Sequence, residues 1–321
     1  MIKYVLKRVL MMIPILMGIL LIVSVFIDIA PGDPARIKLG YEATEEAVQQ
    51  LRDEWGLNDS FLVRYFRFLG NAIQGNFGRS YNNNRTIVDE MAQRFKYTFV
   101  ISVFSVALAV VIGIPLGIFA ATHQYTWKDN AAIALSLITV SMPSFWLALL
   151  LIRFFSIRLG WLPPSGIESW KGWILPTVSL ALGYAAGIVR QMRSNFLEVI
   201  RQDFIITARA KGQTEVRVLY RHALKNAIIP IVLIIGTMFG GSLGGAMIAE
   251  IIYSVPGLGN YMLSGLTARD YPVILATTFF MSTIFSIVIL LIDVAFAFID
   301  PRIRSQYARR KKEVMRRAEQ E

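Results

Sequence analysis

Six apolar runs, each close to the length of a bilayer, limit what this chain can fold into. A helix that crosses a membrane needs about 20 apolar residues, because hydrocarbon offers no partner for backbone hydrogen bonds and a helix satisfies its own. We therefore predict an all-α polytopic membrane protein with six transmembrane helices. The runs are 9–27, 97–121, 131–152, 172–189, 227–249 and 273–292, the last continuing past Asp293 to about Ile299.

The start of the chain supports a first span that stays attached. Lys3, Lys7 and Arg8 precede the run 9–27. A secretory signal peptide has the same basic start, but its apolar part is only about 7 to 15 residues long and ends at a small-residue cleavage site. We assign 1–30 to a short N-terminal segment and an uncleaved first helix.

Composition excludes several functional classes. Hydrophobic residues make up 55% of the 321 residues and charged residues only 17%, a balance typical of an integral membrane protein. The chain has no Cys and two His, so we predict no catalytic residue and no metal site. The net charge of +11 lies at span edges and in the tail, which favours contact with membrane lipid and argues against nucleic acid.

The segment 31–96 is the polar exception, and we predict a small helical insert outside the membrane. Its expected helices are 45–55, closed by Gly56, then 61–73, and a third from a capping-box pattern at Thr86 to Phe95. Two interpretations of the insert stay open. It either packs on the spans as a lid or docks a substrate-binding protein.

Glycine and proline mark two of the predicted spans. Pro143 interrupts the third, and the carbonyls that it frees need partners in protein or in a wet cavity, which favours a helix that lines a pathway. Gly236, Gly240 and Gly244 recur every four residues in the fifth span. Such a row lets another helix approach closely, and we favour packing over substrate contact. In the second span, we expect a bend at Gly113, Pro115 and Gly117.

A polar, basic stretch, 203–230, separates the fourth and fifth spans. Asp203 suits the positive end of a short helix, Arg209 and Lys211 suit its negative end, and Gly212 stands where that helix would stop. We expect a second short helix from Thr214. Phe204, Ile205 and Ile206 supply an apolar anchor, while Ala208 and Ala210 leave a small ridge that fits a groove on another protein.

The order of residues here resembles a known family. The string Thr-Ala-Arg-Ala-Lys-Gly at 207–212, followed by His-Ala-Leu-Lys-Asn-Ala-Ile-Ile-Pro at 222–230, is similar to the coupling loop of type I ABC importer permeases of the dipeptide, oligopeptide and nickel branch. On the generic pattern of the wider family, only Ala208 and Gly212 match. GDPA near Gly32, the string YSVPGLGNY and the string RDYP at 269–272 carry the same likeness elsewhere.

The resemblance implies a division of labour. The core 97–300 would form the translocation pathway with a second related permease, and two P-loop ATPase subunits would drive it. An extracytoplasmic binding protein would deliver dipeptides or oligopeptides. ATP and Mg²⁺ would sit on the ATPases, and this chain would carry no cofactor. The coupling loop, 190–226, would contact the ATPases through Asp203, Thr207, Ala208, Arg209, Ala210, Lys211 and Gly212.

The distribution of Lys and Arg agrees with that scheme, and so does the absence of an ATP-binding motif from this sequence. With the N-terminus inside, the inner segments hold three, one, eight and eight Lys and Arg residues, the last eight in the tail 301–321, which places both termini in the cytoplasm of a bacterial or archaeal cell membrane. The chain has no GxxxxGK[ST] phosphate loop.

Interfacial anchoring is the expected role of the charged residues near span ends, namely Asp28, Arg153, Glu250 and Asp293. Nickel or glutathione import remains an alternative, as does a proton-coupled carrier that works without an ATPase.

Overall fold

The structure, a computed structural model, describes residues 2–299, and its regular elements there are helices. Five of them are long and apolar enough to cross a membrane, and a bent pair brings the number to six if it counts as one span. The predicted all-α fold is confirmed. The long helices are α1 (Ile2–Ile29), α5 (Ile87–Thr122), α8 (Ile174–Ile200), α11 (Leu224–Gly245) and α14 (Tyr271–Ile299).

Helices α5 and α8 form the centre of the bundle because glycine lets their backbones approach closely. A Cβ atom on Gly113 would lie 2.7 Å from the Cβ of Ile188, and one on Gly117 would lie 2.7 Å from the Cβ of Met192. Helix α5 continues through Pro115 as one element. The two glycines thus serve helix packing, and the bend expected at Gly113, Pro115 and Gly117 stays a prediction.

The third predicted span is not a single helix. It divides into α6 (Trp127–Ser141) and α7 (Ser144–Leu151), and α7 continues as a π-helical segment Ile152–Arg158. The bend between α6 and the stretch Ser144–Arg158 is 104°. Pro143 causes the break: it has no N–H to donate, and Met142 before it takes an extended conformation with ψ 128°. The span predicted at 131–152 is therefore a bent pair of helices with its break at Pro143, the residue that the sequence analysis marked as an interruption.

The insert between α1 and α5 contains α2 (Pro34–Leu39), α3 (Glu45–Glu54) and α4 (Phe61–Ile73). Gly56 has φ 65°, as expected of a residue that ends a helix. The third predicted helix is absent as a separate unit, because its residues are the first turns of α5. Thr86 precedes α5 without making a side-chain capping hydrogen bond. The sequence analysis missed α2, whose first turn is capped by the carboxylate of Asp33.

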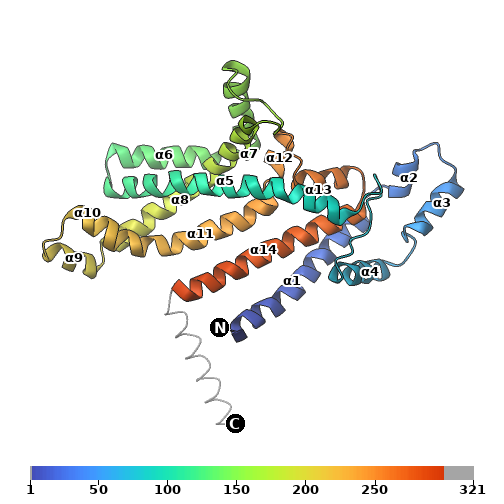
Figure 1. Cartoon of the computed structure of the whole chain (residues 1–321), viewed down its shortest axis with the longest axis horizontal. Coiled ribbons are helices and arrows are strands. Elements are labelled where there is room, and N and C mark those ends of the chain that lie inside the picture. Colours follow the sequence, from blue (N-terminus) through green and yellow to red (C-terminus); the bar gives the residue numbers. More distant parts are fainter. Residues whose placement is uncertain (1, 300–321) are drawn as a thin grey trace, which may run out of the picture.

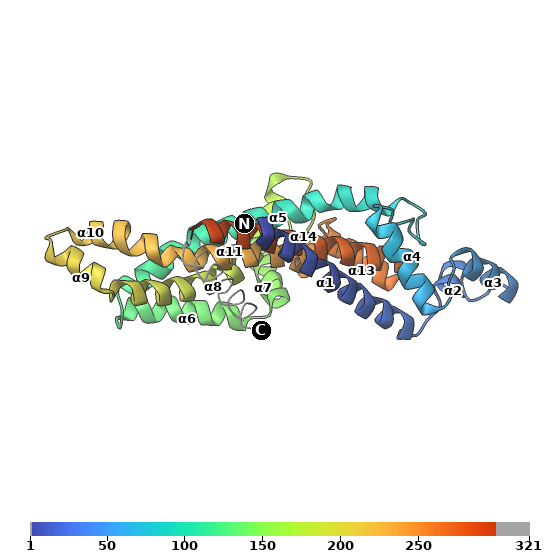
Figure 2. The same ribbon diagram turned by 90° about the horizontal axis from the view of Figure 1, so that it is seen from below.

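The molecule is elongated, and its two polar regions lie at opposite ends (Figure 1). The short helices α9 (Asp203–Ala210) and α10 (Glu215–Arg217) form one end, and α2 and α3 form the other. Figure 2 shows the same separation from a second direction. Arg8 of α1 and Asp293 of α14 form an ion pair at 2.9 Å, so the start of α1 and the end of α14 lie side by side.

Two short helices that the sequence analysis missed connect α11 to α14. They are α12 (Met247–Ile252) and α13 (Leu258–Thr267). The predicted fifth span, 227–249, therefore ends earlier than expected, at Gly245. Its other end extends further than expected, because α10, a π-helical segment Val218–Ala223 and α11 follow one another directly.

Candidate coupling surface and neighbouring sites

Helix α9 begins and ends where its local sequence requires. Asp203 lies in its first turn and Arg209 in its last, so both charges complement the helix dipole. Gly212, two residues beyond the helix, has φ 74°, a left-handed conformation that costs a residue with a Cβ about 1 to 2 kcal/mol. The chain then turns back into α10 at Glu215.

One face of α9 packs against the rest of the chain. Ile205 and Ala208 are buried and belong to the same apolar cluster as Phe196, Val218 and Ala223. Ala208 is only 6% exposed. The sequence analysis placed Ala208 on a ridge presented to a partner, and this is corrected here: the spacing of three between Ile205 and Ala208 puts both side chains on the inward face of the helix.

The other face of α9 is exposed, and exposed apolar side chains occur on it, on α10 and on the segment that follows α10. Thr207, Arg209, Ala210, Lys211 and Gly212 are exposed, as is Asp203. Four large apolar side chains share that exposure, and we call them the coupling patch: Phe204 (43%), Ile206 (56%), Val216 (68%) and Tyr220 (60%). Exposed apolar groups ringed by charges are typical of a protein or membrane contact.

Arg209 has a partner inside this chain. Its guanidinium donates to both carboxylate oxygens of Glu215, at 2.6 and 3.1 Å, and so joins α9 to α10 across the turn at Gly212. The side chains of Arg209 and Glu215 are both exposed. Their hydrogen bonds raise the pKa of Arg209 above its usual value. The internal pair joins the two short helices, and the predicted contact of Arg209 with the ATPases stays a prediction.

A second ion pair holds the helix that leads into α9. Asp129 in the first turn of α6 is buried, and both its oxygens accept hydrogen bonds from Arg193 of α8, at 2.6 and 2.7 Å. The backbone N–H of Tyr125 donates to the same carboxylate at 3.1 Å. The pair makes α6 and α8 one mechanical unit near the coupling end. Sequence reasoning missed it, since 64 residues separate the partners.

Comparison with known families decides the assignment. The model of the binding-protein-dependent transport system inner membrane component matches residues 113–305, and the model of the N-terminal part of the same membrane component matches residues 1–102. The chain belongs to this family. It is accordingly a multi-pass inner membrane protein and the permease subunit of an ABC importer, and it is not an enzyme, because the ATPase is a separate subunit.

Individual relatives agree with the family. The permease is 39% identical over 304 residues to the glutathione transport system permease protein GsiC of Escherichia coli K12, which spans 95% of this chain and 99% of the relative. The corresponding protein of Shigella flexneri serotype 5b is 38% identical over the same shares. Among solved structures, an inward-facing MetNI methionine ABC transporter matches with a TM-score of 0.53 at 21% identity, over 65% of this chain and 94% of that chain. That last likeness shows the fold alone.

The glycines expected at a helix contact in the permease behave in two ways. A Cβ on Gly236 would lie 2.4 Å from Ile292 of α14, and one on Gly240 would lie 3.2 Å from Phe285. Both therefore permit close packing of α11 on α14. Gly244 has no atom within 4 Å of such a Cβ and faces a largely apolar cavity of about 700 Å³ between α1, α11 and α14.

Pro143 lies beside a smaller cavity. The neighbouring residues Met142 and Ser144 line a space of about 330 Å³, together with Gly183 and Tyr184 of α8. The bend between α6 and α7 thus leaves a hollow against α8 that a straight helix would fill. The role of Pro143 in lining a pathway stays a prediction.

Glu250 does not anchor the chain at an interface, as the sequence analysis expected. It is fully buried in α12 and accepts hydrogen bonds from the hydroxyl of Thr98, at 2.6 Å, and from the N–H of Asn260, at 2.9 Å. A Cβ on Gly257 would lie 2.2 Å from the carboxyl carbon. The carboxylate thereby joins α5, α12 and α13. Its neighbours in sequence do not indicate this role, because its partners come from two other elements.

Proposed function

We propose that the permease forms the pathway for short peptides, glutathione among them, that an extracytoplasmic binding protein delivers. Glutathione is itself a small peptide, so the substrate named for these relatives and the peptide-permease sequence motifs agree on one chemical class. The observation that carries the proposal is the exposed coupling patch on α9, α10 and the segment that follows, at the far end of the molecule from the insert (Figure 1).

The partners are inferred from the phosphate-loop motif that the sequence lacks and from the description of the family. The sequence has no phosphate loop, so ATP and Mg²⁺ would bind on two P-loop ATPase subunits. The family description names a binding-protein-dependent system. We infer a complex of this permease, a second related permease, two ATPases and one binding protein, with this chain carrying no cofactor of its own.

The proposed orientation places α9 and both ends of the described chain in the cytoplasm. The excess of Lys and Arg at the start of α1, around α9 and in the sequence after α14 supports it. The ion pair between Arg8 and Asp293 also supports it, because the two ends must then share a side. The insert with α2, α3 and α4 would face the binding protein on the opposite side.

The geometry suggests how motion would pass from the ATPases to the membrane helices. An ATPase that holds the coupling patch would carry α9, and the buried Ile205 and Ala208 would pass that movement to the cluster shared by α8 and α11. The ion pair of Arg193 with Asp129 would carry α6 along with α8. Transport would then be a rigid-body rocking of packed helices between two states.

Reconstitution tests the proposal. The complex is placed in proteoliposomes with ATP inside and binding protein outside, and uptake of labelled glutathione, a dipeptide and Ni²⁺ is measured in separate arms. We expect uptake of a peptide that requires both ATP and the binding protein. Uptake by the permease alone, driven by a proton gradient, would instead establish the carrier alternative, and uptake of Ni²⁺ only would remove the peptide assignment.

A further inference from the structure

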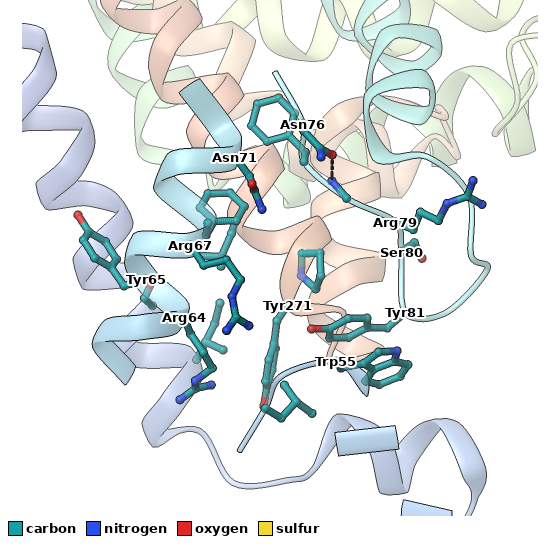
Figure 3. Close-up of a pocket in the computed structure, with 18 of the residues that line it drawn as sticks. Trp55, Arg64, Tyr65, Arg67, Asn71, Asn76, Arg79, Ser80, Tyr81 and Tyr271 are labelled. Atoms are coloured by element: carbon teal, nitrogen blue, oxygen red, sulfur yellow. Dashed lines mark hydrogen bonds between the residues drawn. The ribbon is translucent and has the colours of Figure 1, made fainter. Parts of the chain in front are cut away.

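A cavity of about 470 Å³ lies between the insert and the start of α14, away from the coupling patch (Figure 3). Five parts of the chain build it: α1, the end of α3 with the loop after it, α4, the loop that follows α4, and the residues that open α14. Small-molecule sites usually have volumes of about 300 to 1,000 Å³. The space therefore suits a ligand of a few residues better than a folded segment of another protein.

Aromatic rings form the walls of the cavity and fix its shape. Trp55 and Tyr81 stack in parallel with ring centroids 3.8 Å apart, and Tyr81 meets Tyr271 edge-on at 6.5 Å. Phe77 closes the same wall and contacts Phe279 of α14 at 5.9 Å. Such a wall gives an apolar side chain a flat surface to pack on.

The loop that carries Tyr81 is held in place by a buried carboxylate. Asp270 accepts hydrogen bonds from the hydroxyl of Ser80, at 2.5 Å, and from the N–H of Asn82, at 3.1 Å. Both neighbours of Tyr81 are therefore tied to the residue that precedes α14. The position of the Tyr81 ring is set before any ligand arrives, which lowers the entropy lost on binding.

Polar groups that can donate hydrogen bonds face the cavity. Arg67 and Tyr81 point toward one another across it, and the carboxamide of Asn71 enters from α4 (Figure 3). One nitrogen of Arg67 is bonded to Asp59, which leaves the rest of the guanidinium fork open. Within residues 2–299, neither the Asn71 carboxamide nor the Tyr81 hydroxyl has a hydrogen-bond partner.

The hydroxyl of Tyr81 remains a donor at any physiological pH. Burial raises its pKa above the ordinary value, and the negative charge of Asp270 raises it further. Around the cavity, Arg64 and Arg79 add positive charge, although Arg64 is paired with Asp28, and Glu54 is the acidic side chain among the lining residues. A guanidinium and a hydroxyl that face each other across the cavity suit a carboxylate, which only accepts hydrogen bonds.

We propose that this cavity binds a short peptide by its carboxylate, with an adjacent apolar side chain against Trp55 and Tyr81. It would be a receiving site on the permease, distinct from the site on the binding protein, and its location on the insert would place it where substrate arrives. The inference rests on the proposed function for the class of ligand. It does not depend on the coupling patch.

Binding to the purified complex without its binding protein tests the site. Equilibrium dialysis compares a labelled tripeptide that has a free carboxylate with its carboxy-terminal amide. We expect the acid to bind and the amide to bind about tenfold or more weakly, because charge-assisted hydrogen bonds are lost. Quenching of tryptophan emission by the acid would disappear in Trp55→Phe, whereas dialysis would still detect binding.

Variants then locate the contact. Arg67→Gln and Tyr81→Phe should each weaken binding of the acid and leave the weak binding of the amide unchanged. Arg36→Gln, which removes an arginine of α2 outside the cavity, serves as the matched control and should have no effect. Equal binding of acid and amide, or loss in the control as well, would overturn the proposal.

A further arm separates this inference from the proposed function. ATP-driven uptake is measured with the binding protein present, in wild type and in Arg67→Gln. If uptake requires ATP and binding protein while no peptide binds the permease by dialysis, the proposed function stands and the receiving site is refuted. If binding of the acid appears only when the binding protein is added, the carboxylate is recognised elsewhere, and the receiving site is likewise refuted.

Discussion

Asp129 and Arg193 join α6 to α8 through two hydrogen bonds of 2.6 and 2.7 Å, and the carboxylate is almost entirely buried. The guanidinium is only partly covered, so the pair lies at the edge of the bundle. A buried carboxylate with one charged partner depends strongly on that partner, because few other groups can replace it. The pair also holds the turn between α5 and α6 through the N–H of Tyr125.

Removing one member of this pair should destabilise the permease strongly. We expect Arg193→Gln to lower the free energy of unfolding by about 3 kcal/mol, since it leaves the carboxylate of Asp129 buried and uncompensated. Unfolding of the purified protein in detergent, followed by loss of helical signal, measures the effect.

The control for that experiment is the exposed pair on α9. Glu215→Gln breaks a bridge of similar geometry to Arg209, and exposed pairs contribute only about 0 to 1 kcal/mol. Equal decreases in the free energy of unfolding at the two sites would show that burial of Asp129 does not determine the size of the decrease. The double variant Asp129→Asn with Arg193→Gln should regain part of the stability, because no charge then stays buried.

The close contact between α5 and α8 predicts that substitution by alanine is tolerated less well at Gly117 than at Gly183. A Cβ on Gly117 would lie 2.7 Å from the Cβ of Met192 and 2.8 Å from the carbonyl oxygen of Val189, so Gly117→Ala must separate the helices and cost about 1 to 3 kcal/mol. Gly183→Ala meets no atom within 4 Å and should change stability little. Thermal unfolding of both variants in the same detergent tests the difference; similar shifts would argue against close helix contact at Gly117.

Sequence alone predicted those features that neighbouring residues determine. Apolar length predicted the membrane helices, α4 has the bounds expected from its capping and stop residues, and Gly212 has the left-handed conformation expected at a helix end. Each depends on interactions within a few residues. The family motifs predicted membership, since they are read as strings and need no knowledge of contacts.

The remaining features depend on distant partners. Pro143 signals a disturbance of the third span, but the 104° turn depends on how α7 packs against α8 and α12. The inward direction of Ala208 depends on the cluster that receives it, and the burial of Glu250 depends on Thr98, which lies 152 residues away. No local pattern contains that information, and the sequence analysis accordingly misplaced both residues.

The proposed orientation predicts which side of the membrane labels each end. The natural chain has no cysteine, so Lys211→Cys and Tyr41→Cys each create one reactive thiol, and Tyr41 in the insert is 87% exposed. In intact cells we expect an impermeant maleimide to label Tyr41→Cys and not Lys211→Cys. Permeabilised cells provide the control, because both thiols should then react. Labelling of Lys211→Cys from outside would reverse the orientation and remove the coupling proposal.

Substitutions on the two faces of α9 should impair the permease in different ways. On the exposed face they should weaken the contact with the ATPase, and on the buried face they should destabilise the fold. Ile206 is 56% exposed in the coupling patch, so Ile206→Asp should leave folding intact and place an unpaired charge in the contact with the ATPase. Uptake in proteoliposomes should fall about tenfold or more, as for an important contact residue, while the ATPases still hydrolyse ATP. Ile206→Leu keeps the apolar surface and should retain coupling.

Ala208→Leu should fail through the fold instead. Ala208 packs inward beside Phe196 and Val218, so three added carbons have no room, and overpacking of this kind costs about 1 to 3 kcal/mol. The unfolding temperature of Ala208→Leu should drop, whereas that of Ile206→Asp should not. When both variants are measured below the unfolding temperature of Ala208→Leu, a pull-down should show weaker ATPase binding only for Ile206→Asp. If Ala208→Leu were stable and lost ATPase binding, the alanine would face the partner, and the inward packing of α9 described here would be wrong.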